Sequence, residues 1–254
     1  MKIKFSIRNE FKVAAGLVTV MVLVGFADRN LRHNTCKDIV VTLENVRENH
    51  FLDEADVLRM VETIPGEVRA KQFSVIDFRE IEERLKSHRN FREVQLFNDL
   101  KGNLVVNVSL RRPVARLVQE SGPDAYLSEE GLVIPVSDRY SSRVVILSGS
   151  MVSQVILDQD LNKTEYGRSL KAMLDFINED SFLKKQIAEI ELNSDRTINL
   201  LPQIGSQTIE FGKPENLEAK FLKLKVFYKN ILPERGWNKY RRVNLEFENQ
   251  VIAE

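Results

Sequence analysis

The stretch FREVQLFNDLKGNLVVNVSL, residues 91–110, decides the fold of the first half of the chain. From Leu104 to Leu110, apolar residues recur at every second position, which is typical of a β-strand with one buried face. Phe91 to Phe97 is a second β-rich run, and Asn98 to Gly102 between the two has the composition of a turn. The stretch therefore predicts a β-hairpin with one face on a core.

Upstream of this hairpin, the sequence predicts one strand and two helices. Ile39 to Leu43 is a β-rich run, and Asp53 to Ile64 carries apolar residues at helical spacing. A second helix is expected between about Asp77 and Asn90, because it opens with a capping-box pattern and continues with apolar residues along one face. The order β, α, α, β, β fits one small α+β module, which we place at residues 38–112.

From Pro113 onward the pattern predicts a second, strand-rich α+β domain at residues 113–254. Short β-rich runs alternate with turns, and one helix is expected at about Tyr166 to Asn178. The last three runs before residue 212 should form a meander. The expected strands are Val114–Val118, Tyr126–Leu127, Leu132–Val136, Val144–Leu147, Ile187–Leu192, Thr197–Leu201 and Thr208–Phe211.

The C-terminal part of this domain predicts a helix followed by a strand. Asn216 to Leu232 has a helical apolar stripe and should end at Pro233. After it, Val243, Leu245 and Phe247 alternate with polar residues, as expected for a strand close to the C-terminus.

An apolar segment near the N-terminus predicts a membrane anchor. Phe11 to Ala27 (FKVAAGLVTVMVLVGFA) contains 17 residues and a single charge. At ~1.5 Å per residue it reaches about 25 Å, close to the ~30 Å of a bilayer core. Long or bulky side chains at its two ends suit the membrane interfaces. The anchor residues singled out are Phe11, Lys12, Val18, Leu23, Phe26 and Arg29.

The charges before this segment predict its orientation. Lys2, Lys4 and Arg8 precede it against Glu10 alone, which by the positive-inside rule keeps the N-terminus cytoplasmic. We expect a cytoplasmic tail at residues 1–10, a transmembrane helix at 11–28 and a linker at 29–37. Both domains should then lie outside the cytoplasm.

A cleaved signal peptide is the alternative reading of the same segment. Gly25-Phe26-Ala27 places small residues where a signal peptidase could cut. The length of the apolar run and the bulk of Phe26 favour the uncleaved anchor.

Composition and motifs indicate no catalytic chemistry. Lys plus Arg and Asp plus Glu each number 37, so no net field favours a nucleic acid. Cys36 is the only cysteine, and His33, His50 and His88 lack the spacing of metal ligands. Hydrolase, phosphate-loop and penicillin-binding motifs are missing. We expect no enzyme, metal, cofactor, nucleic acid or small-molecule substrate.

Several segments, taken in order, resemble the bacterial cell-division family FtsQ/DivIB. The resemblance runs over nearly the whole chain and includes the anchor, the βααββ module and the strand-rich domain. Its most specific segments are FSVID (73–77), IEERL (81–85), FREV (91–94), GNLVVNV (102–108), RPVA (112–115) and YLSEEGLVIP (126–135).

This resemblance implies a fold, a location and partners. Residues 38–112 would be a POTRA domain and 113–254 the FtsQ-type β domain. The protein would be a non-enzymatic, single-pass scaffold of the inner membrane at the division septum, mostly periplasmic, with FtsB-like and FtsL-like partners. A partner segment would add to the C-terminal strand. The expected contacts are Phe247 first, then Val243, Leu245, Gln250 and Val251.

A second hypothesis is a secreted or membrane-anchored envelope enzyme or ligand-binding protein with an unrecognised site. A deep polar pocket with convergent ionisable groups would favour it. A shallow surface with an open sheet edge would favour the scaffold.

Overall fold

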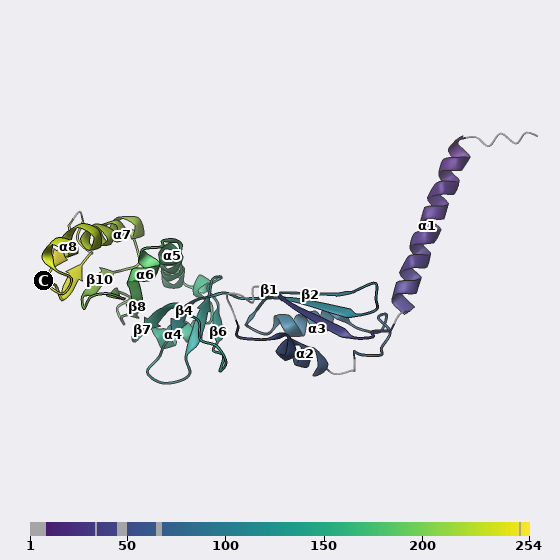
Figure 1. Cartoon of the computed structure of the whole chain (residues 1–254), viewed down its shortest axis with the longest axis horizontal. Coiled ribbons are helices and arrows are strands. Elements are labelled where there is room, and N and C mark those ends of the chain that lie inside the picture. The colour runs from purple at the N-terminus through teal and green to yellow at the C-terminus, as the bar shows by residue number, and fades with distance from the viewer. Residues whose placement is uncertain (1–8, 34, 45–49, 65–67, 249) are drawn as a thin grey trace, which may run out of the picture. The chain divides into compact units, whose positions relative to one another are not determined.

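The computed structural model describes residues 9–33, 35–44, 50–64, 68–248 and 250–254 (Figure 1). The chain divides into two compact units. The first comprises Met1–Glu44 and Asp53–Ser109, and the second comprises Asn45–Leu52 and Leu110–Glu254.

The first globular module has the order β, α, α, β, β that the sequence predicts. Its three strands lie in the order β1-β3-β2, and β1 runs parallel to β3, to which it is connected through two helices and β2. α2 contacts β1 and α3 contacts β2 (Figure 1). The elements are β1 (Ile39–Glu44), α2 (Glu54–Glu62), α3 (Phe78–Lys86), β2 (Phe91–Asn98) and β3 (Leu104–Leu110).

Helix caps and side-chain periodicity explain why these residues form these elements. Asp53 and Asp56 form a full capping box at α2, and the Asp77 carboxylate accepts from the first backbone N–H groups of α3. The alternation predicted from Leu104 to Leu110 is confirmed, since every second residue of β3 is fully or almost fully buried.

The second unit is built on one mixed sheet, in which the described residues form nine strands. Their order is β12-β11-β10-β9-β8-β7-β4-β5-β6. The predicted meander is confirmed as antiparallel β8, β9 and β10. The strands are β4 (Pro113–Leu117), β5 (Ala125–Ser128), β6 (Val133–Pro135), β7 (Val145–Ser148), β8 (Ile187–Leu192), β9 (Ile198–Pro202), β10 (Thr208–Gly212), β11 (Arg242–Asn244) and β12 (Ile252–Ala253).

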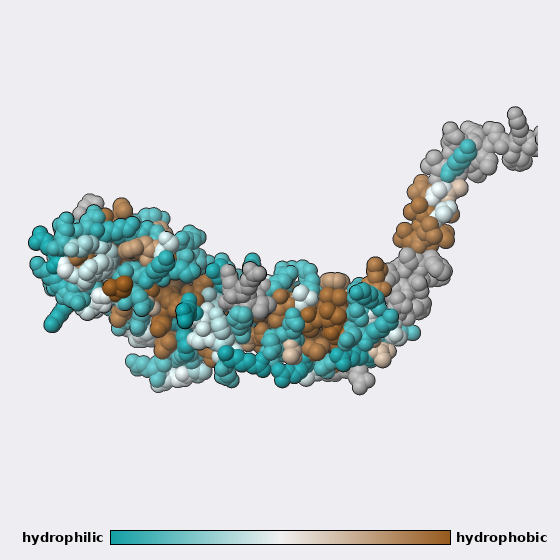
Figure 2. All heavy atoms as spheres, in the orientation of Figure 1, coloured by the Kyte–Doolittle hydropathy of each residue, from teal (hydrophilic) through white to brown (hydrophobic). Residues whose placement is uncertain are grey.

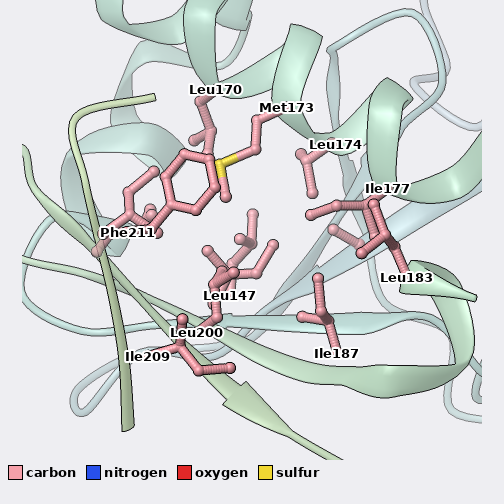
Figure 3. Packing of buried hydrophobic residues seen from close by; sticks show 14 of the residues in the cluster. Leu147, Leu170, Met173, Leu174, Ile177, Leu183, Ile187, Leu200, Ile209 and Phe211 are labelled. Carbon is pink, nitrogen blue, oxygen red and sulfur yellow. The ribbon is translucent and has the colours of Figure 1, made fainter. Parts of the chain in front are cut away.

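Helices bury the apolar residues of one sheet face. Leu170, Met173, Leu174 and Ile177 of α5 point toward strand residues such as Leu200 (Figure 3). The helices of this unit are α4 (Val152–Asp158), the 3-10 turn η1 (Leu161–Lys163), α5 (Glu165–Glu179), α6 (Leu183–Gln186), α7 (Leu217–Val226), the π-helical turn η2 (Phe227–Ile231) and α8 (Leu232–Arg235).

The opposite face of β5 carries a small second cluster. Ala125 and Leu127 belong to the large core, whereas Tyr126 packs with Phe51 and Ile134 on the other side. The rings of Phe51 and Tyr126 are 4.9 Å apart, and the Ser137 hydroxyl donates to the Phe51 carbonyl at 3.0 Å. Residues 50–52 are therefore part of the second unit's packing.

The predicted end of the C-terminal helix is wrong. Helical structure continues past Pro233 to Arg235, because Pro233 occupies one of the first positions of α8, where a backbone N–H is not needed. The π-helical turn η2 directly precedes α8. α4 was not predicted, because the run is only seven residues long and no side-chain cap marks its start.

The N-terminal helix α1 (Asn9–His33) extends beyond the predicted span of 11–28. α1 continues through residues 29–33 of the linker predicted at 29–37, because no Gly or Pro follows Gly25 to interrupt the helix before His33. Among the described residues, no helix is long and apolar enough to cross a membrane.

The described side chains of α1 are exposed. Val18 and Leu23 are 60% and 63% exposed, and Lys12 is exposed as well. Figure 2 shows hydrophobic residues gathered along this part of the helix. The side chains of Phe11, Phe26 and Arg29 and residues 1–8 of the predicted tail lie outside the described part of the chain.

Candidate functional site

The C-terminal edge of the second sheet differs from the prediction. β11 lies between β10, to which it is parallel, and β12, to which it is antiparallel. The strand predicted at 243–247 ends at Asn244 because the Asn244 side chain accepts from the Glu246 N–H at 2.8 Å and turns the chain away. The edge strand is therefore β12, which was not predicted from the sequence.

The backbone of β12 leaves hydrogen-bonding groups on its outer side. Arg242 and Glu254 donate to each other's carbonyl at 3.1 and 3.0 Å, so they are a hydrogen-bonded pair. In an antiparallel ladder the neighbouring pair is then non-hydrogen-bonded, and here it is Val243 opposite Ala253. The Ala253 N–H and C=O consequently point outward, where no further strand is found among the described residues.

The five predicted contact residues fall into two groups. Val243 and Leu245 are fully buried in the core, so their side chains support the edge from inside and are not offered to a partner. Phe247 is 48% exposed, Gln250 is exposed, and Val251 packs partly on the core. Alternation in the sequence identified the apolar positions but not which of them face the solvent.

A groove with both apolar and charged lining residues adjoins this edge. It encloses about 730 Å³ between α7 and the residues that lead from β11 to β12. Leu222 and Val226 of α7, which are 63% and 45% exposed, line one wall, and Gln250 and Val251 line the other. Ile252 on β12 is 37% exposed. Leu222, Val226 and Ile252 were not predicted from the sequence, because exposed positions of a helix or of a two-residue strand give no distinct signal.

Lys223 ties the residues after β11 to α7. Its ammonium donates to the carbonyls of Leu245 and Phe247 at 2.6 and 2.7 Å. Burial lowers the pKa of the Lys223 ammonium below its ordinary value. Both contacts are charge-assisted, so Lys223 fixes where the backbone of Phe247 lies.

Glu210 on β10 ties β11 to the rest of the sheet. Its carboxylate accepts from Arg242 at 2.9 Å and from Asn244 at 2.7 Å. Hydrogen bonding by Arg242, and secondarily by Asn244, holds the pKa of the Glu210 carboxyl below its ordinary value. The parallel pairing of β10 and β11 therefore has an ionic component.

This ion pair predicts a pH dependence of stability. Because the pKa of Glu210 is depressed in the folded protein, its contribution is present above the ordinary carboxyl pKa of about 4.5 and is lost as the pH falls through the folded pKa. Glu210→Gln should lower the unfolding free energy at pH 7, and its difference from the unaltered protein should shrink below about pH 4.5. Urea unfolding between pH 3 and 7 measures this. Glu120→Gln, at an exposed carboxylate, is the control, and a pH-independent difference for Glu210→Gln would contradict the assignment.

The second unit also contains a polar cavity of about 630 Å³. Its wall carries three basic and three acidic side chains but neither His nor Cys, so it offers no Ser–His or Cys–His pair. Asp175 in this wall is paired with Lys171 at 2.6 Å. No group of three or more possible metal ligands occurs among the described residues. The charged residues of the wall are Arg112, Glu129, Arg143, Asp175, Glu179 and Lys184.

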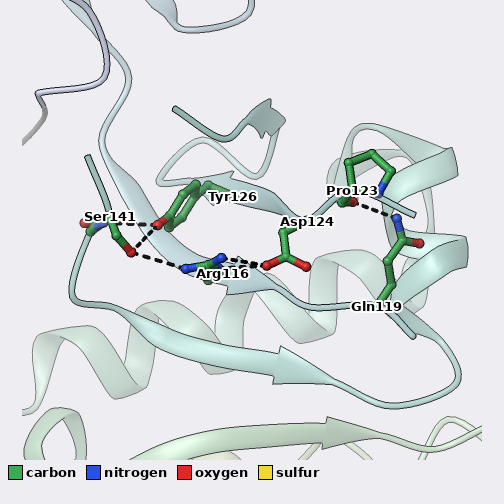
Figure 4. Close-up of polar contacts among 7 residues, drawn as sticks. Arg116, Gln119, Pro123, Asp124, Tyr126 and Ser141 are labelled. Atoms are coloured by element: carbon green, nitrogen blue, oxygen red, sulfur yellow. Dashed lines mark hydrogen bonds and ion pairs between the residues drawn. The ribbon is translucent and has the colours of Figure 1, made fainter. Parts of the chain in front are cut away.

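A neighbouring cluster of polar side chains holds the loop around residue 141 against the sheet. Arg116 on β4 donates to Asp124 at 2.7 Å and to the Ser141 hydroxyl at 3.2 Å (Figure 4). The Tyr126 hydroxyl also lies 3.2 Å from the Ser141 hydroxyl and accepts from the Ser142 N–H. These bonds fix the loop around residue 141 on the sheet. The polar groups of this cluster are therefore satisfied by one another and do not indicate a ligand site.

Comparison with known proteins agrees with this architecture. Residues 34–109 match the POTRA-like domain family, and residues 112–254, more than half of the chain, match the family described as FtsQ/DivIB, C-terminal related. A search of curated proteins finds no match. The predicted combination of a POTRA-like and a strand-rich α+β domain is thereby confirmed, and the chain belongs to the FtsQ/DivIB family of bacterial cell-division scaffolds.

Proposed function

We propose that this chain is a membrane-anchored, non-enzymatic scaffold that captures FtsB-like and FtsL-like division proteins by strand addition at β12. The observation that carries the proposal is the outward-pointing backbone of Ala253 at an open sheet edge. An extended segment can satisfy such groups with its own N–H and C=O, which gives affinity without requiring a particular sequence.

Selectivity would come from side chains beside the edge. Phe247 and Ile252 are partly exposed near the edge, and the groove with Leu222 and Val226 can take apolar side chains of an added strand. Gln250 supplies a polar contact at the rim. Val243 and Leu245 drop out of the predicted contact set because they are buried.

The anchor belongs to the same proposal. Residues 11–28 within α1 would span the inner membrane with the N-terminus in the cytoplasm, which leaves both units outside it. Tethering to the layer in which bitopic partners are also anchored raises their effective concentration at β12.

Replacing Phe247 tests the proposed site. Phe247→Lys should weaken capture of the extracytoplasmic segment of an FtsB-like partner by about 30-fold, since a central aromatic contact contributes roughly 2 kcal/mol. Equilibrium binding with the full chain in detergent measures this. Phe247→Leu should retain most of the affinity.

A matched control uses an exposed aromatic residue outside β11, β12 and the groove. Trp237 is 42% exposed, close to the 48% of Phe247. Trp237→Lys should bind normally. Equal affinity of Phe247→Lys and the unaltered chain would contradict the proposed site.

A further inference from the structure

The chain directly after α1 is tied to two turns of the first unit. The Lys37 N–H donates to the Gly102 carbonyl in the β2–β3 turn at 2.8 Å. The Cys36 N–H donates to the Lys71 carbonyl at 2.7 Å, in the segment before α3. These two turns therefore lie at the end of the unit where the chain leaves α1.

Exposed apolar side chains gather at this end. Leu100 in the β2–β3 turn is 91% exposed, and Phe97 just before it is 45% exposed. Val75, 69% exposed, follows the other turn, where Thr35 forms a bridge with Gln72. A single exposed leucine is ordinary on a protein surface, but three apolar residues at one end are not explained by the core.

Three exposed lysines share this end with them. We call the set the α1-proximal surface, defined as Lys37, Lys71, Val75, Phe97, Leu100 and Lys101. Apolar side chains together with long cationic ones are the combination that suits a lipid interface, where the ammonium groups reach phosphates while their stems lie in an apolar layer.

The turn that carries Leu100 is fixed by hydrogen bonds. The Asp99 carboxylate accepts from the N–H of Lys101 at 2.9 Å and of Asn103 at 2.7 Å. Gly102 adopts φ +88°, which few other residues tolerate, and its N–H donates to the Asp99 carbonyl. Leu100 is thus held outward before it meets any partner, so little conformational entropy is lost on contact.

Chain length limits how far this surface can lie from a membrane. Beyond the proposed span, residues 29–33 add about 8 Å of helix, comparable to the headgroup layer of a bilayer. Four Cα–Cα steps then separate His33 from Lys37, which corresponds to at most about 14 Å. The β2–β3 turn, bonded to Lys37, is within reach of the lipid surface.

We propose that the α1-proximal surface contacts the outer leaflet, with Leu100, Phe97 and Val75 entering the headgroup region beside three lysines that face lipid phosphates. This inference rests on the anchor in the proposed function. It adds a second membrane contact, which would fix the orientation of the first unit on the bilayer.

Site-directed fluorescence in vesicles tests the contact. The full chain carrying Cys36→Ala would be reconstituted in phosphatidylethanolamine–phosphatidylglycerol vesicles, with an environment-sensitive probe on single cysteines at Met21, Ser87 or Leu100. Met21 lies in α1 and is 73% exposed, and it reports the anchor. Ser87 follows α3, near the start of β2 and one strand length, about 25 Å, from the β2–β3 turn, so it is the control.

The expected result is a blue-shifted emission, quenched by spin-labelled lipid, at residues 21 and 100 but not at 87. If the probe at residue 100 reports water while the probe at residue 21 reports lipid, this inference is overturned and the proposed anchor is retained. A probe in water at residue 21 would overturn both.

A charge change separates lipid contact from other causes. Combining Lys71→Glu with Lys101→Glu should remove the shift at residue 100 and leave that at residue 21 unchanged. A shift at residue 100 that appears only after a partner protein is added would show that this surface binds protein, and would overturn the lipid assignment.

Discussion

Ala253→Pro is expected to lower partner capture by about 100-fold or more while leaving the fold intact. The substitution removes the one backbone N–H of β12 that we expect to donate to an added strand, and the proline ring occupies the space of that strand. The partner carbonyl then loses its donor, at a cost of roughly 1–3 kcal/mol, and steric exclusion adds to this. Equilibrium binding with an FtsB-like segment measures the loss.

The fold should survive because this N–H does not serve the sheet. Proline is tolerated on edge strands where its position faces solvent. Ala253→Val keeps the N–H and should bind normally, whereas Ile252→Pro removes an N–H that faces β11 and should disturb the edge itself. Normal capture by a folded Ala253→Pro variant would rule out strand addition at β12.

Phe221→Ala should destabilise the second unit by about 3–5 kcal/mol. Phe221 on α7 is 1% exposed, and its ring stacks on Phe176 of α5 at 5.0 Å and packs on Phe211 of β10 at 4.9 Å. Its removal leaves a cavity between two helices and the sheet, which their backbones can close only in part.

The unfolding free energy of the second unit can be measured separately from that of the first. Trp237 is the only tryptophan of the chain and lies in this unit, 6.2 Å from the ring of Tyr228, so its fluorescence during urea unfolding reports this unit alone. Leu222→Ala changes the neighbouring residue of the same helix, which is 63% exposed, and should shift stability by less than about 0.5 kcal/mol. Similar losses for the two variants would contradict the packing described for α7.

Local sequence patterns carried most of the information on the first module. The period of two in residues 104–110 fixed which side chains of β3 are buried, because one face of that sheet is covered by helices. The cap at Asp77 likewise located the start of α3. In each case the pattern that predicts the element lies within a few residues along the chain.

Less of the candidate site could be predicted from the sequence, because it is formed by residues that are far apart along the chain. Val243 and Leu245 alternate as in a strand, yet both are buried, because they pack in one core with residues of α7 such as Leu224. β12 has two residues and therefore no periodicity, and its place at the edge depends on pairing with β11. Nothing in the local sequence of Lys223 indicates that it binds carbonyls more than 20 residues away.

The small cluster around Phe51 has a consequence for dividing this protein into parts. The family match of the second domain begins at residue 112, but Tyr126 and Ile134 are covered by Phe51, which precedes α2 in the chain. A fragment cut at the family boundary would expose two large apolar side chains and lose the Ser137 bond to the Phe51 carbonyl. The two modules are consequently poor candidates for shuffling, because the second takes one of its packing residues from inside the sequence of the first.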